Sequence, residues 1–289
     1  SANGILTFSK TIKNQLIVSL SSLEALVDLK EDLHNYQLDF FKNSKKESNK
    51  YKNEAIIFGD NTDTYRVDKM AEVLLRHEID VYKLEDDIMH NKIVYNRDNS
   101  YLIPKNQKKF KLIEAIFDKR TNFNDSLFYD VSAWTFPYAF DLNFDMGVSN
   151  FKLGKKLQNI EDKKYKKVED NAYAYLIDWC NYNAPAALNH LLNNKIITKV
   201  ATKEFEINNR SFSYGTLLIP FEINRSKKIK SAFEYISNEL NIEIHTVKSG
   251  DSDGPDLGSN SFKKINKKEI ALIIGNGVNA YDAGEVWHL

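Results

Sequence analysis

Two patterns of apolar and polar positions alternate along this chain. Short apolar runs such as 54–60 and 100–104 predict buried strands, because polar and turn-forming residues bound them. Longer segments such as 65–79 carry apolar residues every three or four positions and predict amphipathic helices. The second half repeats this order, with expected strands at 172–178 and 215–220 and helical spacing after each. The pattern therefore predicts two related α/β lobes.

The order of the expected elements also predicts how the strands pair. A strand at 54–60, a helix at 65–79 and a strand at 80–84 follow one another through short connections. Such a unit favours a parallel pair of strands joined by a right-handed crossover. Because the unit recurs, we expect an α/β fold with mostly parallel sheets flanked by helices. A last strand is expected at 269–275.

The first part of the chain predicts a helix and a charged linker. Residues 21–41 have helical spacing, and residues 42–53 are charged and almost free of apolar side chains. The expected buried stripe of the helix is Leu23, Leu26, Leu29, Leu33, Leu38 and Phe41. The resulting division is helix and linker at 1–53, a first lobe at 54–150, a lysine-rich connector at 151–170 and a second lobe at 171–289.

Composition narrows the classes of partner. The chain has 40 basic and 40 acidic side chains among 289 residues, so its net charge does not indicate a nucleic acid as a partner. No apolar run approaches the roughly 18 residues that a membrane span needs. The single cysteine excludes an internal disulfide and a zinc cluster built from several thiolates.

The familiar catalytic and metal-binding motifs do not occur. The six histidines are scattered singly, without the spacing of a helical zinc site. Cys180 follows an expected strand, but Trp179 and Asn181 beside it do not suit the tight turn of a nucleophile elbow. The acidic loop 251–256 lacks the spacing of a calcium-binding loop. We expect no catalytic or metal-binding residue, and no cofactor in this chain.

Two features remain as candidates for binding. Residues 275–280 fit the G-x-G-x-x-A pattern of a dinucleotide-binding turn, but the second strand and acidic residue of such a site do not follow. We interpret these glycines as turn geometry. Polar and aromatic side chains that follow expected strands either line a pocket or pack helices on the sheet. These candidates are Asp60, Trp134, Asp178, Trp179 and Tyr182.

Several longer stretches resemble a known family. The sequences "SLFYDVSAWTFPYAF", "GTLLIP", "DLGSNSF" and "IALIIGNGVNAYDAGEVWHL", together with segments 18–41 and 65–84, look like the region after the catalytic domain in bacterial zinc carboxypeptidase-like proteins. The resemblance covers about residues 15–289. It implies a flavodoxin-like or class I amidotransferase-like fold. It also implies an upstream peptidase domain that holds the zinc and the catalytic residues, none of which has a counterpart here.

The resemblance implies a role and a setting. The chain is expected to be a piece of a longer protein, cut at both ends, that is periplasmic or secreted and cleaves C-terminal residues from peptides. The piece itself would be a non-catalytic accessory region that supports the peptidase domain, forms a homodimer or binds part of the peptide substrate. Two alternatives stay open: an independent module that binds a small molecule or peptide at the carboxyl ends of the strands, and an enzyme that uses Cys180.

Overall fold

The computed structural model describes residues 6–119, 135–160, 168–169, 172–225 and 228–288. Its internal contacts divide the chain into two compact units. The first unit consists of residues Ser1–Asn61 and Val67–Ile160, and the second of Thr62–Arg66 and Glu161–Leu289.

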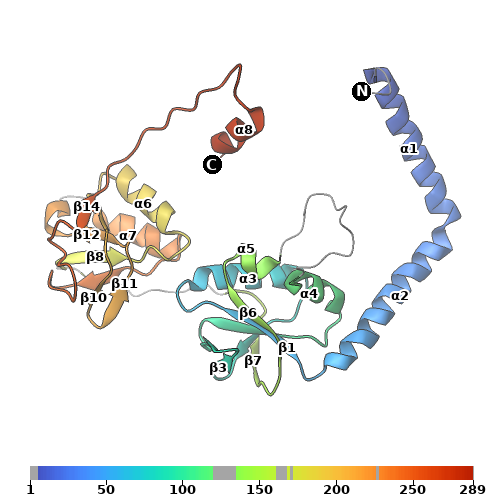
Figure 1. Ribbon diagram of the computed structural model, residues 1–289, viewed down its shortest axis with the longest axis horizontal. Coiled ribbons are helices and arrows are strands. Elements are labelled where there is room, and N and C mark those ends of the chain that lie inside the picture. Colours follow the sequence, from blue (N-terminus) through green and yellow to red (C-terminus); the bar gives the residue numbers. More distant parts are fainter. Residues whose placement is uncertain (1–5, 120–134, 161–167, 170–171, 226–227, 289) are drawn as a thin grey trace. The chain divides into compact units, whose positions relative to one another are not determined.

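The first unit contains a five-stranded sheet with the strand order β6-β1-β5-β2-β7. Its strands β1, β6 and β7 are labelled in Figure 1. All of its strand pairs are antiparallel. Its elements are α1 (Phe8–Asp28), α2 (Lys30–Ser48), η1 (Asn49–Tyr51), β1 (Ala55–Gly59), α3 (Thr64–Arg76), β2 (Tyr82–Leu84), β3 (Ile88–His90), β4 (Ile93–Tyr95), β5 (Ser100–Pro104), α4 (Phe110–Phe117), α5 (Phe136–Ala139), β6 (Asn143–Val148) and β7 (Leu153–Lys156).

The second unit repeats this topology, with the strand order β13-β8-β12-β9-β14 and only antiparallel pairs. Apart from the short helices α5 and η2, the sheet strands, the two covering helices and the intervening hairpin follow in the same order along the chain in both units. Its elements are β8 (Ala174–Ile177), α6 (Ala184–Asn193), β9 (Lys199–Ala201), β10 (Phe205–Ile207), β11 (Arg210–Phe212), β12 (Leu217–Pro220), η2 (Glu222–Asn224), α7 (Ile229–Asn238), β13 (His245–Val247), β14 (Phe262–Lys264) and α8 (Ala280–His288).

The expected mostly parallel sheets, and with them the flavodoxin-like or amidotransferase-like fold, are wrong. The helical crossover itself forms, because β1 and β2 are both antiparallel to β5 and therefore run in the same direction. However, β5 lies between them and takes the hydrogen bonds that a parallel pair would share. The strand β12 separates β8 from β9 in the same way. Periodicity locates strands but does not reveal a later strand that inserts between two earlier ones.

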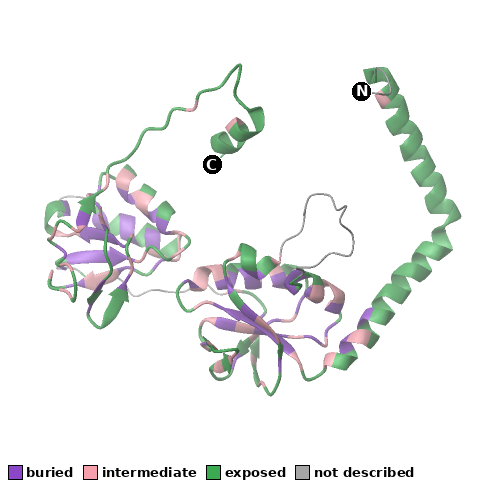
Figure 2. Cartoon of the chain, in the orientation of Figure 1, coloured by how far each residue is buried: buried purple, intermediate pink, exposed green. Residues whose placement is uncertain are grey.

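Each sheet is buried on both faces, which explains its continuous apolar strands. In β1, Ile56 and Phe58 face a core formed with α3 and α4, while Ala55 and Ile57 face a core closed by the hairpin β3–β4. The buried residues, purple in Figure 2, are concentrated in the sheets and in the helices that cover them. In the second unit, α6 and α7 cover one face of the sheet, and the hairpin β10–β11 covers the other. Both units therefore consist of helices, a sheet and a hairpin in three layers.

The ends of the chain differ from the sequence-based expectation. The expected buried stripe of the first helix is exposed: Leu23, Leu26, Leu29, Leu33, Leu38 and Phe41 are 45–60% accessible, because no described residue covers them. The charged segment 42–53 is helical up to Ser48, whose hydroxyl donates to the Asn106 side chain at 3.1 Å.

At the other end, residues 269–275 form an extended but unpaired segment instead of the expected strand. Ile270, Ile273 and Ile274 are 74–86% accessible, and the helix α8 that follows has no buried residue. A strand needs a neighbour to satisfy its backbone hydrogen bonds, and none of the described strands provides one here.

Candidate functional site

The loop that joins β8 to α6 carries three of the five candidate residues. Asp178 follows the last residue of β8, and its Oδ1 accepts the backbone N–H of Cys180 at 3.1 Å. Trp179 packs on Gly215, where a Cβ atom would lie 2.9 Å from the indole ring. Gly215 also has a φ of +90°, so the backbone and the Trp179 contact both require glycine at this position. Trp179 is therefore a packing residue of the loop.

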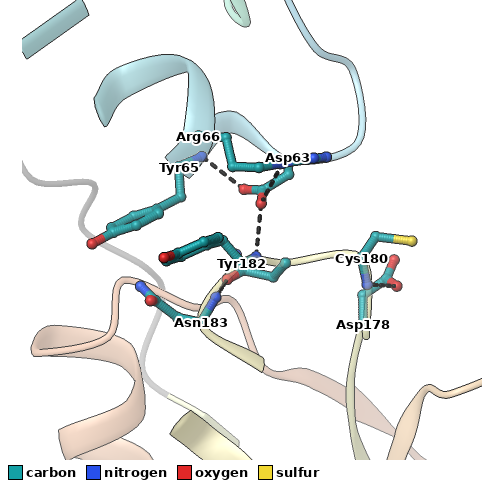
Figure 3. Close-up of polar contacts among 8 residues, drawn as sticks. Asp63, Tyr65, Arg66, Asp178, Cys180, Tyr182 and Asn183 are labelled. Carbon is teal, nitrogen blue, oxygen red and sulfur yellow. Dashed lines mark hydrogen bonds and ion pairs between the residues drawn. The ribbon is translucent and has the colours of Figure 1, made fainter. Parts of the chain in front are cut away.

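Tyr182, on the same loop, is held by a carboxylate that the sequence analysis missed. Asp63 is fully buried, and its Oδ2 accepts the backbone N–H of Tyr182 at 2.7 Å and Nε of Arg66 at 3.1 Å (Figure 3). Its Oδ1 accepts the backbone N–H of Tyr65 at 2.9 Å, as the N-cap of a helix does. The rings of Tyr65 and Tyr182 stack at 5.9 Å. An Asp directly before the helical pattern at 64–76 is the signal that could have identified Asp63.

The other two candidates do not join this loop. Asp60 belongs to the first unit, where it follows β1 and donates its backbone N–H to the Asn99 carbonyl at 3.3 Å. Trp134 lies outside the described residues. The structure thus brings together Asp178, Trp179 and Tyr182 only as neighbours on one loop, where they make structural contacts.

Cys180 is exposed, and its Sγ lies 3.5 Å from Oγ of Ser213. A hydroxyl group does not deprotonate a thiol, so this contact gives Cys180 no activation as a nucleophile. The contact with Ser213 therefore does not support the alternative of an enzyme that uses Cys180.

A cavity of about 330 Å³ lies along the edge strand β13 of the second unit. It is lined by the consecutive residues Glu243–Val247 and, across from them, by Ile207, Asn208, Arg210 and Phe212 of the hairpin β10–β11. Successive side chains of a strand point to opposite faces, so a cavity that all five residues line follows the edge of the strand. None of the five candidates from the sequence is among its lining residues.

The charged groups of this cavity surround His245. Nε2 of His245 lies 3.7 Å from Glu243, whose carboxylate lies 3.8 Å from Arg210. Burial, and secondly the charge of Arg210, lower the pKa of His245 below its usual value, while Glu243 and Asp178 act in the opposite direction. The imidazole is therefore neutral near pH 7, and it meets the ring of Phe212 edge-on at 5.6 Å.

In the first unit, the two residues equivalent to Phe212 and His245 are joined by a hydrogen bond. Asp145 pairs with the third residue of β1, as His245 pairs with the third residue of β8. Tyr95 ends its hairpin, as Phe212 ends β11, and its hydroxyl donates to Oδ2 of Asp145 at 2.9 Å. Burial and the Asp145 carboxylate raise the pKa of Tyr95 well above its usual value, so the phenol keeps its proton and this bond. The Phe212–His245 contact of the second unit lacks such a bond.

The described residues contain no group of three or more His, Cys, Asp or Glu side chains that could hold a metal ion. Among these described residues, no helix is both long and apolar enough to cross a membrane.

Comparison with protein-family models, with curated proteins and with solved structures finds no match to this chain. The resemblance drawn from its sequence therefore stays a prediction.

Proposed function

We propose that this chain is a non-catalytic accessory α/β region of a zinc carboxypeptidase-like protein, with its first helix docked in the peptidase domain. In this proposal the peptidase domain holds the zinc and cleaves C-terminal residues from peptides. The same resemblance favours an exported protein. The stretches quoted above support the choice of partner, and the surface of α1 supports the docking.

The surface of α1 is the observation that carries the proposal. Leu16, Ile17, Val18 and Leu20 are 50–60% accessible, and no charged residue occurs between Asn14 and Leu23. Successive helical residues are about 100° apart, so these four side chains span about 200° of the helix circumference, and Gln15, Ser19 and Ser22 take much of the rest. This arc is about twice the stripe of roughly 100° that a surface helix buries, so burial of α1 needs neighbours on more than one side.

Burial of the apolar surface of α1 favours a surrounding domain over a simple helix pair. Burying one Leu, Ile or Val side chain contributes about 1.5–3 kcal/mol. A two-stranded coiled coil buries a single seam and leaves the opposite side of each helix in water. Because apolar residues occupy both sides of α1, only a partner that encloses the helix buries them all.

The test compares this chain with a version extended at its N-terminus by the peptidase domain. We expect only the extended protein to hold stoichiometric zinc and to release C-terminal residues from peptides, with strong amide protection of 16–23 against hydrogen exchange. Ile17→Asp should remove this protection, whereas Lys13→Asp, a control on the same helix, should not. Zinc binding and chelator-sensitive peptidase activity by the present chain alone would overturn the proposal. A stable dimer of the present chain with protected α1 would instead favour a homodimer.

A second candidate function, an independent binding module, is favoured by the cavity along β13. An extended peptide that adds to an edge strand takes its hydrogen bonds from the free backbone, and its side chains enter neighbouring pockets. The buried side chains of Phe212 and Val247 line this cavity beside the charged Arg210 and Glu243. This ligand site lies near the carboxyl end of β8, since His245 pairs with Leu176.

The test for this module is a thermal-shift screen of small molecules and of terminally blocked Val- and Ile-rich pentapeptides. The double variant Phe212→Tyr/His245→Asp transfers the closing pair of the first unit and should abolish any shift. Tyr214→Phe, at an exposed position of the same unit, is the matched control. A ligand-induced shift that survives the double variant would place the binding elsewhere.

A further inference from the structure

The unpaired segment near the C-terminus repeats the opening of the first unit. Without gaps, Ala271–Ala283 (ALIIGNGVNAYDA) aligns with Ala55–Val67 (AIIFGDNTDTYRV). Four aligned positions are identical: an Ala, an Ile, a Gly and a Tyr. The four residues before the aligned glycine are apolar in both segments.

Local geometry agrees with this alignment. The helix α3 begins at Thr64 and α8 begins at Ala280, which are aligned positions. Oδ1 of Asp63 accepts the N–H of Tyr65 at 2.9 Å, and Oδ1 of Asn279 accepts the N–H of Tyr281 at 3.0 Å. The two segments therefore share a capped helix start at the same distance from the same apolar run.

We propose that residues 271–288 are the opening strand and helix of a third unit of this fold. Their partner is a polypeptide that supplies two antiparallel strands, one on each side, as β5 and β6 do for β1. This pairing explains why Ile273 and Ile274 are exposed. Among the described residues nothing covers either face of the segment, and no strand pairs with either of its edges.

The aligned glycines define where the partner approaches. At Gly59 an added Cβ atom would meet the Ser100 side chain and the Asn99 carbonyl, because β5 passes close to this position. At Gly275 the same atom would meet nothing within 4 Å. The third segment thus has glycine at the position where the first unit needs it for the close approach of a strand, and the partner supplies that strand. In the unpaired segment Gly275 has a φ of +132°, which Gly59 does not share, so pairing also requires this residue to change its backbone conformation.

The experiment uses β5 and β6 of the first unit as the probe partner. In the full chain, Ala55–Val67 is replaced by the sequence of Ala271–Ala283. The control carries the sequence shifted by one residue, Ile270–Asp282, which turns every strand side chain to the opposite face. Amide exchange of Leu102 and Ile103 in β5, with the thermal midpoint, reports whether the sheet forms.

We expect the aligned replacement to keep the β5 amides protected, with exchange within about tenfold of the original chain, and the shifted control to lose that protection. A second variant exchanges only Ala55–Gly59 for Ala271–Gly275, which leaves Asp63 and Arg66 in place. If this strand-only replacement loses protection as fully as the shifted control, the proposal is overturned. The experiment uses only the present chain and no peptidase domain. Its outcome therefore tests this proposal independently of the proposed function.

Discussion

Gln107 and Asn224 make the same three hydrogen bonds in the two units. The amide of Gln107 accepts the N–H of Asp80 at 2.7 Å and donates to the carbonyls of Asp80 and Pro104 at 2.9 and 2.7 Å. The amide of Asn224 binds the N–H and carbonyl of Ile197 and the carbonyl of Pro220 at 2.8–2.9 Å. In the first unit the Gln107 side chain joins the residues just before β2 to the end of β5. In the second unit the Asn224 side chain joins the residues just before β9 to the end of β12.

Removing either amide should destabilise its own unit. Gln107→Ala and Asn224→Ala leave buried backbone groups without partners, which costs about 1–3 kcal/mol for an unsatisfied group. Urea unfolding followed by circular dichroism measures the loss. Gln37→Ala, on the exposed face of α2, should change the free energy of unfolding by less than about 0.5 kcal/mol. Equal stabilities of all three variants would contradict the assigned role.

Asp63 should contribute more to the stability of the fold than a residue that only caps a helix. It caps α3 and also binds the N–H of Tyr182, whereas Asn279 caps an exposed helix through one bond. Asp63→Ala is expected to cost about 2–4 kcal/mol, because a typical cap contributes about 1 kcal/mol and two further donors lose their acceptor. Asn279→Ala is the matched control and should leave the thermal midpoint within about 1 °C. A midpoint unaffected by Asp63→Ala would show that Tyr182 is held by other contacts.

The two glycines at equivalent strand ends should respond differently to substitution. Gly59→Ala places a methyl group against Ser100 and should lower the thermal midpoint by several degrees, because an overpacked site costs about 1–3 kcal/mol. Gly275 has open space around it but a φ of +132°, which alanine rarely adopts. Because this exposed segment has no neighbouring atoms to hold that conformation, its backbone can shift, and Gly275→Ala should lower the midpoint less than Gly59→Ala does. Calorimetry of the two variants side by side measures the difference.

Stability should depend on pH through His245. Its pKa is lowered in the folded state, so on acidification the unfolded chain takes up this proton first. The stabilising contribution is complete above the usual histidine pKa of 6.5 and is lost as the pH falls from there toward the lower folded pKa. His245→Gln should flatten the decrease in unfolding free energy between about pH 7 and pH 5. His34→Gln on an exposed helix controls for the loss of an imidazole, and an unchanged slope in His245→Gln would refute the assignment.

The local parts of this fold could be predicted from the sequence. Four or five apolar residues before a polar turn locate β1 and β8, and the spacing of Val67, Met70 and Leu74 locates α3. The pairing of the strands could not be predicted, because the register that places Leu102 beside Ile57 is a contact between distant residues. The five candidate residues were chosen by the rule for parallel sheets, that ligands bind at the carboxyl ends of the strands. In an antiparallel sheet neighbouring strands do not share such an edge, and the cavity follows β13 instead.

The insertion of β5 between β1 and β2 also governs when the first unit can form during synthesis. Both neighbours of β1 are made after it, and the second of them, β6, ends at Val148. At about 5–20 residues per second, Ile56 and Phe58 wait on the order of 5–20 s before both of their flanking strands exist. Until β6 is made, the nascent chain carries an apolar strand with at least one unpaired edge, the kind of segment that chaperones bind and that aggregates when it is left uncovered.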